Sequence, residues 1–312
     1  MVHGVVFSRE PMHRNVSDYS AGELSVMILY HYCSNYVFHS IVTQKKVRMS
    51  LLSLSNDYKE GQHIIDVARG AIPDESLHKK DILKELQLII SVISAIGFCL
   101  SADGDVLSQW RGYADNAQGV AIGFDKEALD AATKQDEPQA LITRFAPVAY
   151  DEKFLTKIIA ADLEPVIEHY KSGKMALPRF GSLLMPLTDE DHEKDKLRHK
   201  QATSELFWKL MKIANYAYMV KAPFFDEEEE WRILTLVTNL DQVLDMPGAQ
   251  FQTSSEKLKP FKDFPQKGFA PSAIKEVILG PRNQTPDEVV RLFLNSQGFD
   301  HVSIRRSSGS YR

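Results

Sequence analysis

Short apolar segments typical of β-strands recur along this chain, and one long stretch with helical spacing interrupts them. The strand-like segments lie at 24–32, 46–50, 96–101, 119–124, 231–237, 277–281 and 302–307. Each is five to nine residues long and bounded by turn residues, as buried strands are. Between 152 and 220 the apolar residues recur at three and four positions instead. This alternation predicts a single α+β domain over 1–312, a mixed β-sheet surrounded by helices, with a helical insertion at 152–220.

Shorter helices are expected between the strands. Ser34 suits the N-cap of a helix that follows it, Asp125 suits the cap of another, and 74–92 has an amphipathic pattern that includes Leu77. In the insertion, the mixed-charge block 188–200 is interpreted as a solvated linker or helix end rather than a nucleic-acid patch.

The segment 285–298 carries the strongest helix signals in the chain. Thr285 stands at the expected cap, Pro286 at the first helical position and Gly298 at the far end.

Composition and charge exclude several classes of protein. Hydrophobic residues make up 44% and charged residues 25% of the 312 residues, which is the ordinary globular range. A net charge of −5 provides no broad cationic field for nucleic acid. Charged residues within 1–18 argue against a signal peptide, and no apolar run approaches the ~20 residues of a membrane span, so no membrane partner is expected. With Cys33 and Cys99 as the two cysteines, both in apolar runs, a reducing, cytoplasmic location is predicted.

Four polar clusters lie at strand ends or between strands, where functional sites are often built. They are Tyr30-His31-Tyr32, Ser108-Gln109-Trp110-Arg111 with Tyr113, the acidic run Asp226 to Glu230 before Trp231-Arg232, and Ser307 with Tyr311-Arg312.

Each cluster also has a purely structural interpretation. His31 suits a core histidine, Trp110 and Trp231 suit core aromatics, and the acidic run suits a solvated turn. The run adjoins a strand, however, so the two-residue period places Glu228 and Glu230 on one face. Adjacent carboxylates repel, and a cation should therefore lie opposite them; Arg111, Arg232 and Arg312 are the candidates.

Other familiar chemistries lack their motifs. His192 and His199 are too far apart for a helical zinc pair, and no metal site is expected. The sequence contains no G-x-S-x-G, no G-x-x-x-x-G-K-[ST] and no G-x-G-x-x-G after a strand.

Several blocks together resemble the bacterial family of domains of unknown function numbered 2971 (DUF2971). They are L-Y-H-Y-C-S at 29–34, S-N-D at 55–57, L-S-Q-W-R-G-Y-A-D at 107–115 followed by G-V-A-I-G-F-D, F-x-x-E-x-E-W-R at 225–232, I-L-G-P at 278–281 and the terminal S-x-x-x-Y-R. The L-S-Q-W-R and E-x-E-W-R blocks are the most specific. The chain departs from the expected pattern at Cys33, where a threonine is expected.

The order of these blocks also resembles the split-sheet ADP-ribosyltransferase fold in its His-Tyr-Glu form, by analogy of fold. That resemblance implies NAD as a substrate and an acceptor macromolecule of unknown identity. It assigns catalytic roles to Glu230, His31 and Tyr113: Glu230 would stabilise the cationic sugar, His31 would also bind NAD, and Tyr113 would stack on nicotinamide. It implies contacts with NAD, a nucleotide-type small molecule, at Tyr32, Ser108, Trp110, Arg111, Glu228, Arg232 and Arg312. Arg111 would hold the pyrophosphate.

Two alternatives remain open on the sequence alone. One is a non-catalytic module in which these polar residues recognise a ligand or partner. The other is a nuclease-like or hydrolytic enzyme that uses the acidic run with a divalent ion, although such ions usually draw carboxylates from different strands.

Overall fold

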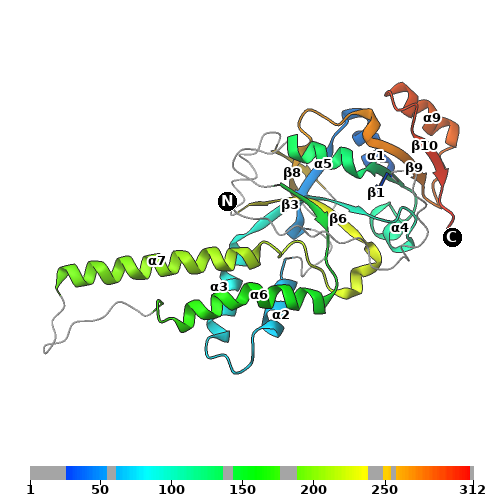
Figure 1. Cartoon of the computed structure of the whole chain (residues 1–312). Helices are drawn as coiled ribbons and strands as arrows, with labels where there is room; N and C mark the ends of the chain where they lie inside the picture. The colour runs from blue at the N-terminus through cyan, green and yellow to red at the C-terminus, as the bar shows by residue number, and fades with distance from the viewer. Residues whose placement is uncertain are drawn as a thin grey trace, which may run out of the picture.

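The computed structural model describes residues 26–54, 61–135, 143–175, 188–237, 249–253 and 258–309. These residues form an α+β structure in which helices surround one mixed, open β-sheet, so the predicted fold class is confirmed (Figure 1). The S-N-D block at 55–57, Tyr311, Arg312 and the N-terminal segment lie outside the described residues. No helix within the described ranges is long and apolar enough to cross a membrane.

Ten strands form the sheet in the part of the chain that the structure describes. Their order is β10-β9-β4-β1-β3-β2-β8-β7, with β6 pairing to both β3 and β5. All pairs are antiparallel except β9 with β10. The strands are β1 (Ile28–Cys33), β2 (Val47–Leu51), β3 (Ser94–Ser101), β4 (Val120–Asp125), β5 (Thr143–Pro147), β6 (Glu230–Val237), β7 (Ala249–Thr253), β8 (Leu258–Phe264), β9 (Ile274–Leu279) and β10 (Ser303–Arg306).

The sheet divides at β3, and this division positions the site. Along one edge, β6 pairs with all eight residues of β3, from Ser94 to Ser101. Along the other edge, β2 pairs with β3 at Ile96 and Gly97, and β1 pairs with it at Ser101. Strands β1 and β2 therefore diverge from each other, and the backbone of β3 between Gly97 and Ser101 faces the gap between them.

Two groups of helices cover the sheet (Figure 1). Helices α1 (Asn35–Gln44), α5 (Lys126–Gln135) and α9 (Asp287–Ser296) pack on a core that contains residues of β1, β3, β4 and β9. Helices α2 (His63–Ala71), α3 (Lys79–Val92), α6 (Glu152–Lys171) and α7 (Asp189–Ala214) form a second core, which reaches the sheet at Ala95 and Leu234. The insertion helices α6 and α7 thus share their core with α2 and α3.

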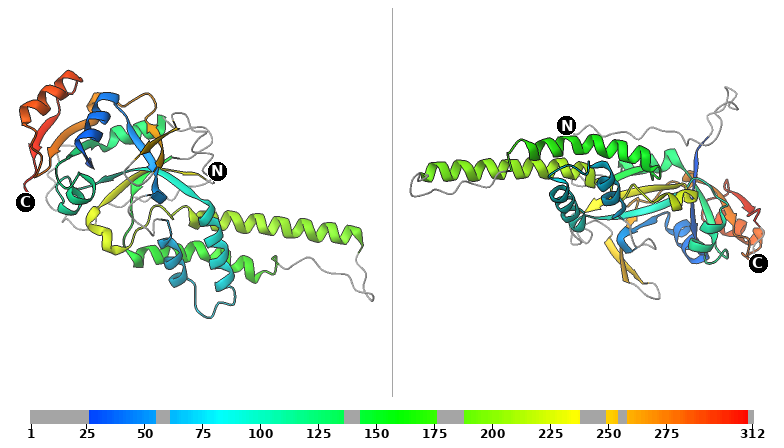
Figure 2. Two further views of the ribbon diagram at one scale, coloured as in Figure 1. Left: turned by 180° about the vertical axis from the view of Figure 1, so that it is seen from behind. Right: turned by 90° about the horizontal axis from the view of Figure 1, so that it is seen from below.

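Capping residues explain where several helices begin. The Ser34 hydroxyl accepts a hydrogen bond from the backbone N–H of Val37 (3.3 Å), and Asp125 accepts one from Ala128 (3.2 Å), as predicted. Thr188 and Asp191 form a capping box at the start of α7. The charged block 188–200 is therefore a helix end, and Figure 2 shows this end of α7 extending beyond the rest of the structure.

Two predicted helix starts were wrong. The helix expected over 74–92 begins at Lys79, and Leu77 precedes it with 91% of its surface exposed. The helix expected at 285–298 begins at Asp287 with Pro286 as its N-cap, so Thr285 is not the cap; its hydroxyl loses that role because Pro286 has an extended backbone. Gly298 has a positive φ of 83°, which suits a residue just after a helix.

Candidate functional site

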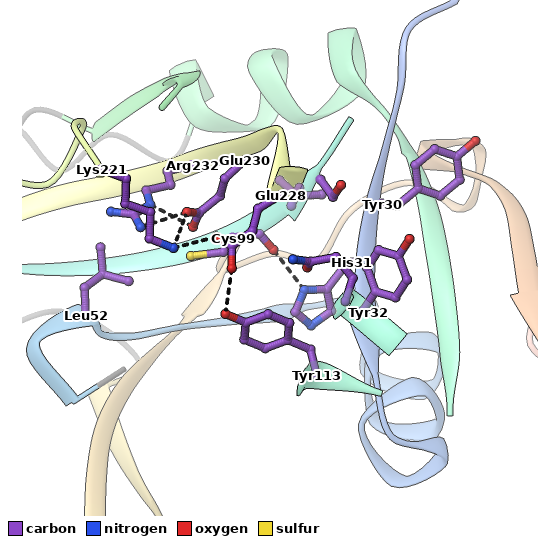
Figure 3. Close-up of a pocket in the computed structure, with 13 residues that line it drawn as sticks. Tyr30, His31, Tyr32, Leu52, Cys99, Tyr113, Lys221, Glu228, Glu230 and Arg232 are labelled. Carbon is purple, nitrogen blue, oxygen red and sulfur yellow. Dashed lines mark hydrogen bonds and ion pairs between the residues drawn. The ribbon is translucent and has the colours of Figure 1, made fainter. Parts of the chain in front are cut away.

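A cavity of about 110 Å³ opens where β1 and β2 diverge along β3, a place that we call the fork of the sheet (Figure 3). It is bounded by β1, β3, α4 (Leu107–Tyr113) and the segment that leads into β6. By the usual measure of about 10–15 Å³ per water, it holds several waters or one small ring. It is lined by Tyr30, His31, Tyr32, Leu52, Cys99, Leu100, Ser101, Gln109, Tyr113, Lys221, Glu228, Glu230 and Arg232.

Four charged side chains form one wall of this cavity. Glu230 and Arg232 alternate with Trp231 on β6, so both point to the same face of the sheet. Arg232 donates two parallel hydrogen bonds to the Glu230 carboxylate, from Nε at 2.8 Å and from Nη2 at 2.9 Å. Lys221 Nζ lies 2.6 Å from Glu228 Oε2 and 3.1 Å from Glu230 Oε2. We call these four residues the charged quartet.

Three members of the quartet are buried, Glu228 is partly exposed, and the positive and negative charges compensate one another. Glu230 is 6% exposed and Arg232 is 1% exposed. Burial by itself raises the pKa of Glu230, but Arg232 and Lys221 outweigh it and lower this pKa to about 2. Burial by itself lowers the pKa of Lys221, but Glu230 and Glu228 raise it above its usual range. These opposite shifts keep Glu230 and Lys221 in their charged forms, and the formal charges of the quartet sum to zero.

Backbone and tyrosine contacts hold the quartet in place. Arg232 Nη1 donates to the carbonyl of Tyr218 at 2.7 Å, at the end of the helical insertion. The backbone N–H of Glu230 donates to the hydroxyl oxygen of Tyr150 at 3.0 Å. Glu228 ends a 3-10 turn, η3 (Pro223–Glu228), and the left-handed backbone of Glu229 (φ 40°) then leads into β6. Glu228 and Glu230 consequently share Lys221, whereas Glu229 is exposed.

His31 links β1 to β3 through a side-chain hydrogen bond. Its Nδ1–H donates to the carbonyl of Cys99 at 3.0 Å, which leaves Nε2 with its lone pair. The ring also packs on Phe98, with the ring centroids 4.4 Å apart. Although part of the imidazole faces the cavity, burial lowers the pKa of His31 to about 4. His31 is therefore neutral at pH 7 and acts there as a hydrogen-bond acceptor.

Tyr113 lies at the mouth of the cavity, at the C-terminal end of α4. It is 44% exposed, and its hydroxyl points to Glu228 Oε1 at 3.4 Å. Burial of the hydroxyl and the charge of Glu228 raise the pKa of Tyr113 above its usual range. The ring is thus a neutral aromatic surface beside the opening.

The structure brings most of the predicted site residues to this one cavity. His31, Tyr32, Tyr113, Glu228, Glu230 and Arg232 line it, although they come from three separated parts of the sequence. The predicted cation opposite the acidic run is Arg232, together with Lys221, which the sequence analysis did not single out.

Three other predicted residues that the structure describes, Ser108, Trp110 and Arg111, are not among those that line the cavity. Trp110 is a core residue: its ring meets Tyr32 edge-on at 4.8 Å, and its indole N–H donates to Asp105 at 2.8 Å. Arg111 is exposed on α4, and Ser108 on the same helix is half-buried. The predicted common cleft of His31, Arg111, Tyr113 and Glu230 thus contains three of these residues but not Arg111, because successive residues of a helix point in different directions.

The C-terminal cluster has an anchoring contact with the start of α4. Ser307 Oγ donates to Asp105, and Ser308 donates to the same carboxylate through its backbone N–H at 2.7 Å and its hydroxyl at 2.8 Å. These bonds lower the pKa of Asp105, although burial by itself raises it. Arg312 lies outside the described residues, and its predicted contact with NAD stays a prediction.

The sequence analysis missed Lys221 and Gln109 as site residues. Lys221 comes directly after the helical insertion, and its place seven positions before Glu228 was the available signal. Gln109 lies in the L-S-Q-W-R block, but contacts with NAD were predicted there for Ser108, Trp110 and Arg111 instead. Within the described residues, no group of three or more His, Cys, Asp or Glu side chains is arranged to hold a metal ion.

Comparison with known proteins supports the resemblance found in the motifs. The family model described as "Protein of unknown function (DUF2971)" matches residues 109–233. This span begins at Gln109 and ends in β6, so it contains Tyr113 and the whole charged quartet. No curated protein and no solved structure matches the chain.

Proposed function

We propose that this cavity binds the nicotinamide end of NAD and cleaves the nicotinamide–ribose bond, with transfer of ADP-ribose to an acceptor macromolecule or to water. The observation that carries this proposal is the convergence of His31, Tyr113 and two carboxylates on one small cavity at the fork of the sheet. A cavity of about 110 Å³ accommodates a ring-sized group. The rest of a dinucleotide would lie outside it, beyond Tyr113.

The reaction needs an anionic environment beside the sugar. When the glycosidic C–N bond breaks, its electron pair goes to the ring nitrogen and nicotinamide leaves as a neutral molecule. Positive charge then develops on the ribose until an acceptor oxygen or nitrogen attacks the anomeric carbon and loses its proton. A carboxylate close to the sugar stabilises this transition state more than the ground state, and the rate rises accordingly.

The two glutamates of the charged quartet have different partners, so we assign them different roles in stabilising the cationic sugar. Glu230 has both oxygens within hydrogen-bonding distance of Arg232 and Lys221, so its charge is compensated in place. Glu228 shares only Lys221 among these cations, and its other oxygen faces Tyr113 at the mouth. We therefore assign the stabilisation of the cationic sugar mainly to Glu228, with Glu230 placing Lys221 and Arg232.

His31 and Tyr113 supply the remaining contacts of the proposal. The free Nε2 of neutral His31 accepts a hydrogen bond from a ribose hydroxyl. The half-exposed ring of Tyr113 stacks on the nicotinamide ring, an arrangement that is favourable for planar aromatics. Arg111, exposed on the same helix, is the candidate for contact with the pyrophosphate outside the cavity. NAD is available in the cytoplasm, the location predicted from the low cysteine content, Cys33 and Cys99.

A non-catalytic recognition module is the second candidate, and one observation favours it. The four charges of the quartet already satisfy one another, as in polar networks that fix a fold or a binding surface. Under this alternative the cavity binds a small ligand without chemical change. No contact described above favours the nuclease-like alternative.

Nicotinamide release separates the two candidates. The full chain is incubated with NAD and cell extract as a source of acceptor, and free nicotinamide is quantified by chromatography. The proposal predicts release by the wild type and a reduction on the order of 10²-fold or more in Glu228→Gln. The matched control is Glu227→Gln, an exposed position of the same acidic run, which should keep the wild-type rate. NAD binding without any release would favour the recognition module.

A further inference from the structure

Gln109 is a buried polar side chain that lines the cavity and has no hydrogen-bond partner among the described residues. It lies on α4, is 7% exposed, and contributes to the cavity lining. No hydrogen bond to its side-chain amide is found among the residues that the structure describes, whereas its cavity neighbours His31, Tyr32 and Glu230 all have partners.

The amide atoms of Gln109 are not among the fully enclosed polar atoms of the described residues, so they remain open to whatever occupies the cavity. Burial of such a group without a hydrogen bond opposes folding, and most buried polar groups are therefore paired. A primary amide presents one acceptor oxygen and two N–H donors in a plane. The group that complements it best is a second primary amide, which returns both an acceptor and a donor in the same plane.

We propose that Gln109 recognises a primary carboxamide carried on a planar ring, and so makes the cavity selective for the amide over the corresponding carboxylic acid. This inference rests on the proposed function for the identity of the ring, nicotinamide. Leu52 and Leu100 supply apolar contacts for the ring. Tyr113 supplies an aromatic face at the mouth.

The discrimination against the acid follows from the donors that each ligand offers. A carboxylate has two acceptor oxygens and no N–H, so the Gln109 carbonyl would face another acceptor. The charged quartet does not reverse this preference, because its charges sum to zero and its cations already contact carboxylates. Loss of one hydrogen bond with a polar group left unpaired corresponds to about a tenfold or greater difference in affinity.

The test compares nicotinamide with nicotinate, and benzamide with benzoate, by ligand-observed NMR on the full chain. The wild type should bind each amide at least about tenfold more tightly than its acid. Gln109→Leu should bind the amides more weakly and lose the preference. The same substitution should not lower the midpoint of thermal unfolding, because an unpartnered buried amide is replaced by an apolar group of similar size. Gln118→Leu, at an exposed glutamine after α4, is the matched control and should keep the preference.

The outcomes separate this inference from the proposed function. Equal binding of amide and acid, no binding of either, or a preference that survives in Gln109→Leu would overturn the role of Gln109. If NAD is nevertheless cleaved, the proposed function stands without that role. A Gln109-dependent preference for amides in a protein that neither binds nor cleaves NAD would support Gln109 and refute the proposed function.

Discussion

Glu230 and Arg232 lie two positions apart on β6 and form a bidentate ion pair, with Nε and Nη2 of the arginine 2.8 and 2.9 Å from the two carboxylate oxygens. The same carboxylate contacts Lys221, and the same guanidinium donates to the carbonyl of Tyr218. This pair therefore connects the strand to the end of the helical insertion. It supports the wall of the cavity as well as forming part of it.

Removing the charge of Glu230 should destabilise the fold. In Glu230→Gln, Arg232 and Lys221 keep their charges in a buried place but lose a carboxylate that both contact. Breaking a buried ion pair on one side typically costs about 3–5 kcal/mol in the free energy of unfolding. Urea denaturation at pH 7 measures this cost. A loss below about 1 kcal/mol would show that the pair does not hold the strand to the insertion.

Acid should lower the free energy of unfolding, because it protonates the Glu230 carboxylate. The pKa of Glu230 is about 2 in the folded protein against an ordinary value of 4.5, so folding favours the ionised form. The resulting stabilisation, about 3 kcal/mol, is fully present above pH 4.5 and is lost as the pH falls toward 2. The urea midpoint of the wild type should fall across this window more steeply than that of Glu230→Gln. Parallel pH profiles for the two proteins would contradict this assignment.

Removal of the His31 ring should affect binding and stability together. His31→Ala loses the Nε2 acceptor, the ring contact with Phe98 and the hydrogen bond to Cys99. We expect NAD binding to weaken by about tenfold and the free energy of unfolding to fall by about 1–2 kcal/mol. Calorimetric titration and urea denaturation give the two numbers. His39→Ala, at an exposed histidine of α1, is the control; an equal loss of binding there would remove His31 from the site.

The charged end of α7 should open more readily than the strands of the site. Residues 188–200 are mostly exposed and extend beyond the rest of the structure, so few buried contacts protect their hydrogen bonds. Hydrogen exchange should give lower opening free energies there than in β3 and β6. Protection equal to that of β3 would mean that this end is covered by contacts that the structure does not describe.

Apolar runs and capping residues were enough to predict most of the fold. Seven strand-like segments correspond to described strands, and Ser34 and Asp125 cap helices as expected. Strands β5, β7 and β8 were not predicted. Strand β7 has only two apolar residues, Ala249 and Phe251, and is not buried, whereas Pro260 and two lysines hide the alternation of β8. Helix α3 was predicted five residues too long because Leu77 fits the helical period although it is exposed.

The faces of site residues were predictable where those residues lie in strands, whereas Tyr113 on α4 and Glu228 in η3 were named from their motif blocks. His31, Glu230 and Arg232 follow the two-residue period of β1 and β6, so their faces could be assigned. Within α4 the same reasoning did not separate Gln109, which lines the cavity, from Trp110, which packs in the core. Lys221 reaches the two glutamates because the end of the insertion pairs at Val220 with Ala149, which follows β5. No local sequence pattern predicts that two segments so distant in the chain lie side by side.

Titration of NAD into the full chain, followed by calorimetry, tests the central claim most directly. The proposal predicts saturable heat with one NAD bound per chain, and a weaker affinity in Tyr113→Ala than in Tyr113→Phe, because the phenyl ring keeps the stacking surface at the mouth of the cavity. Saturation at one site that depends on this ring would place NAD at the fork of the sheet. An absence of saturable heat in the wild type, together with no nicotinamide release, would refute NAD as the ligand of this cavity.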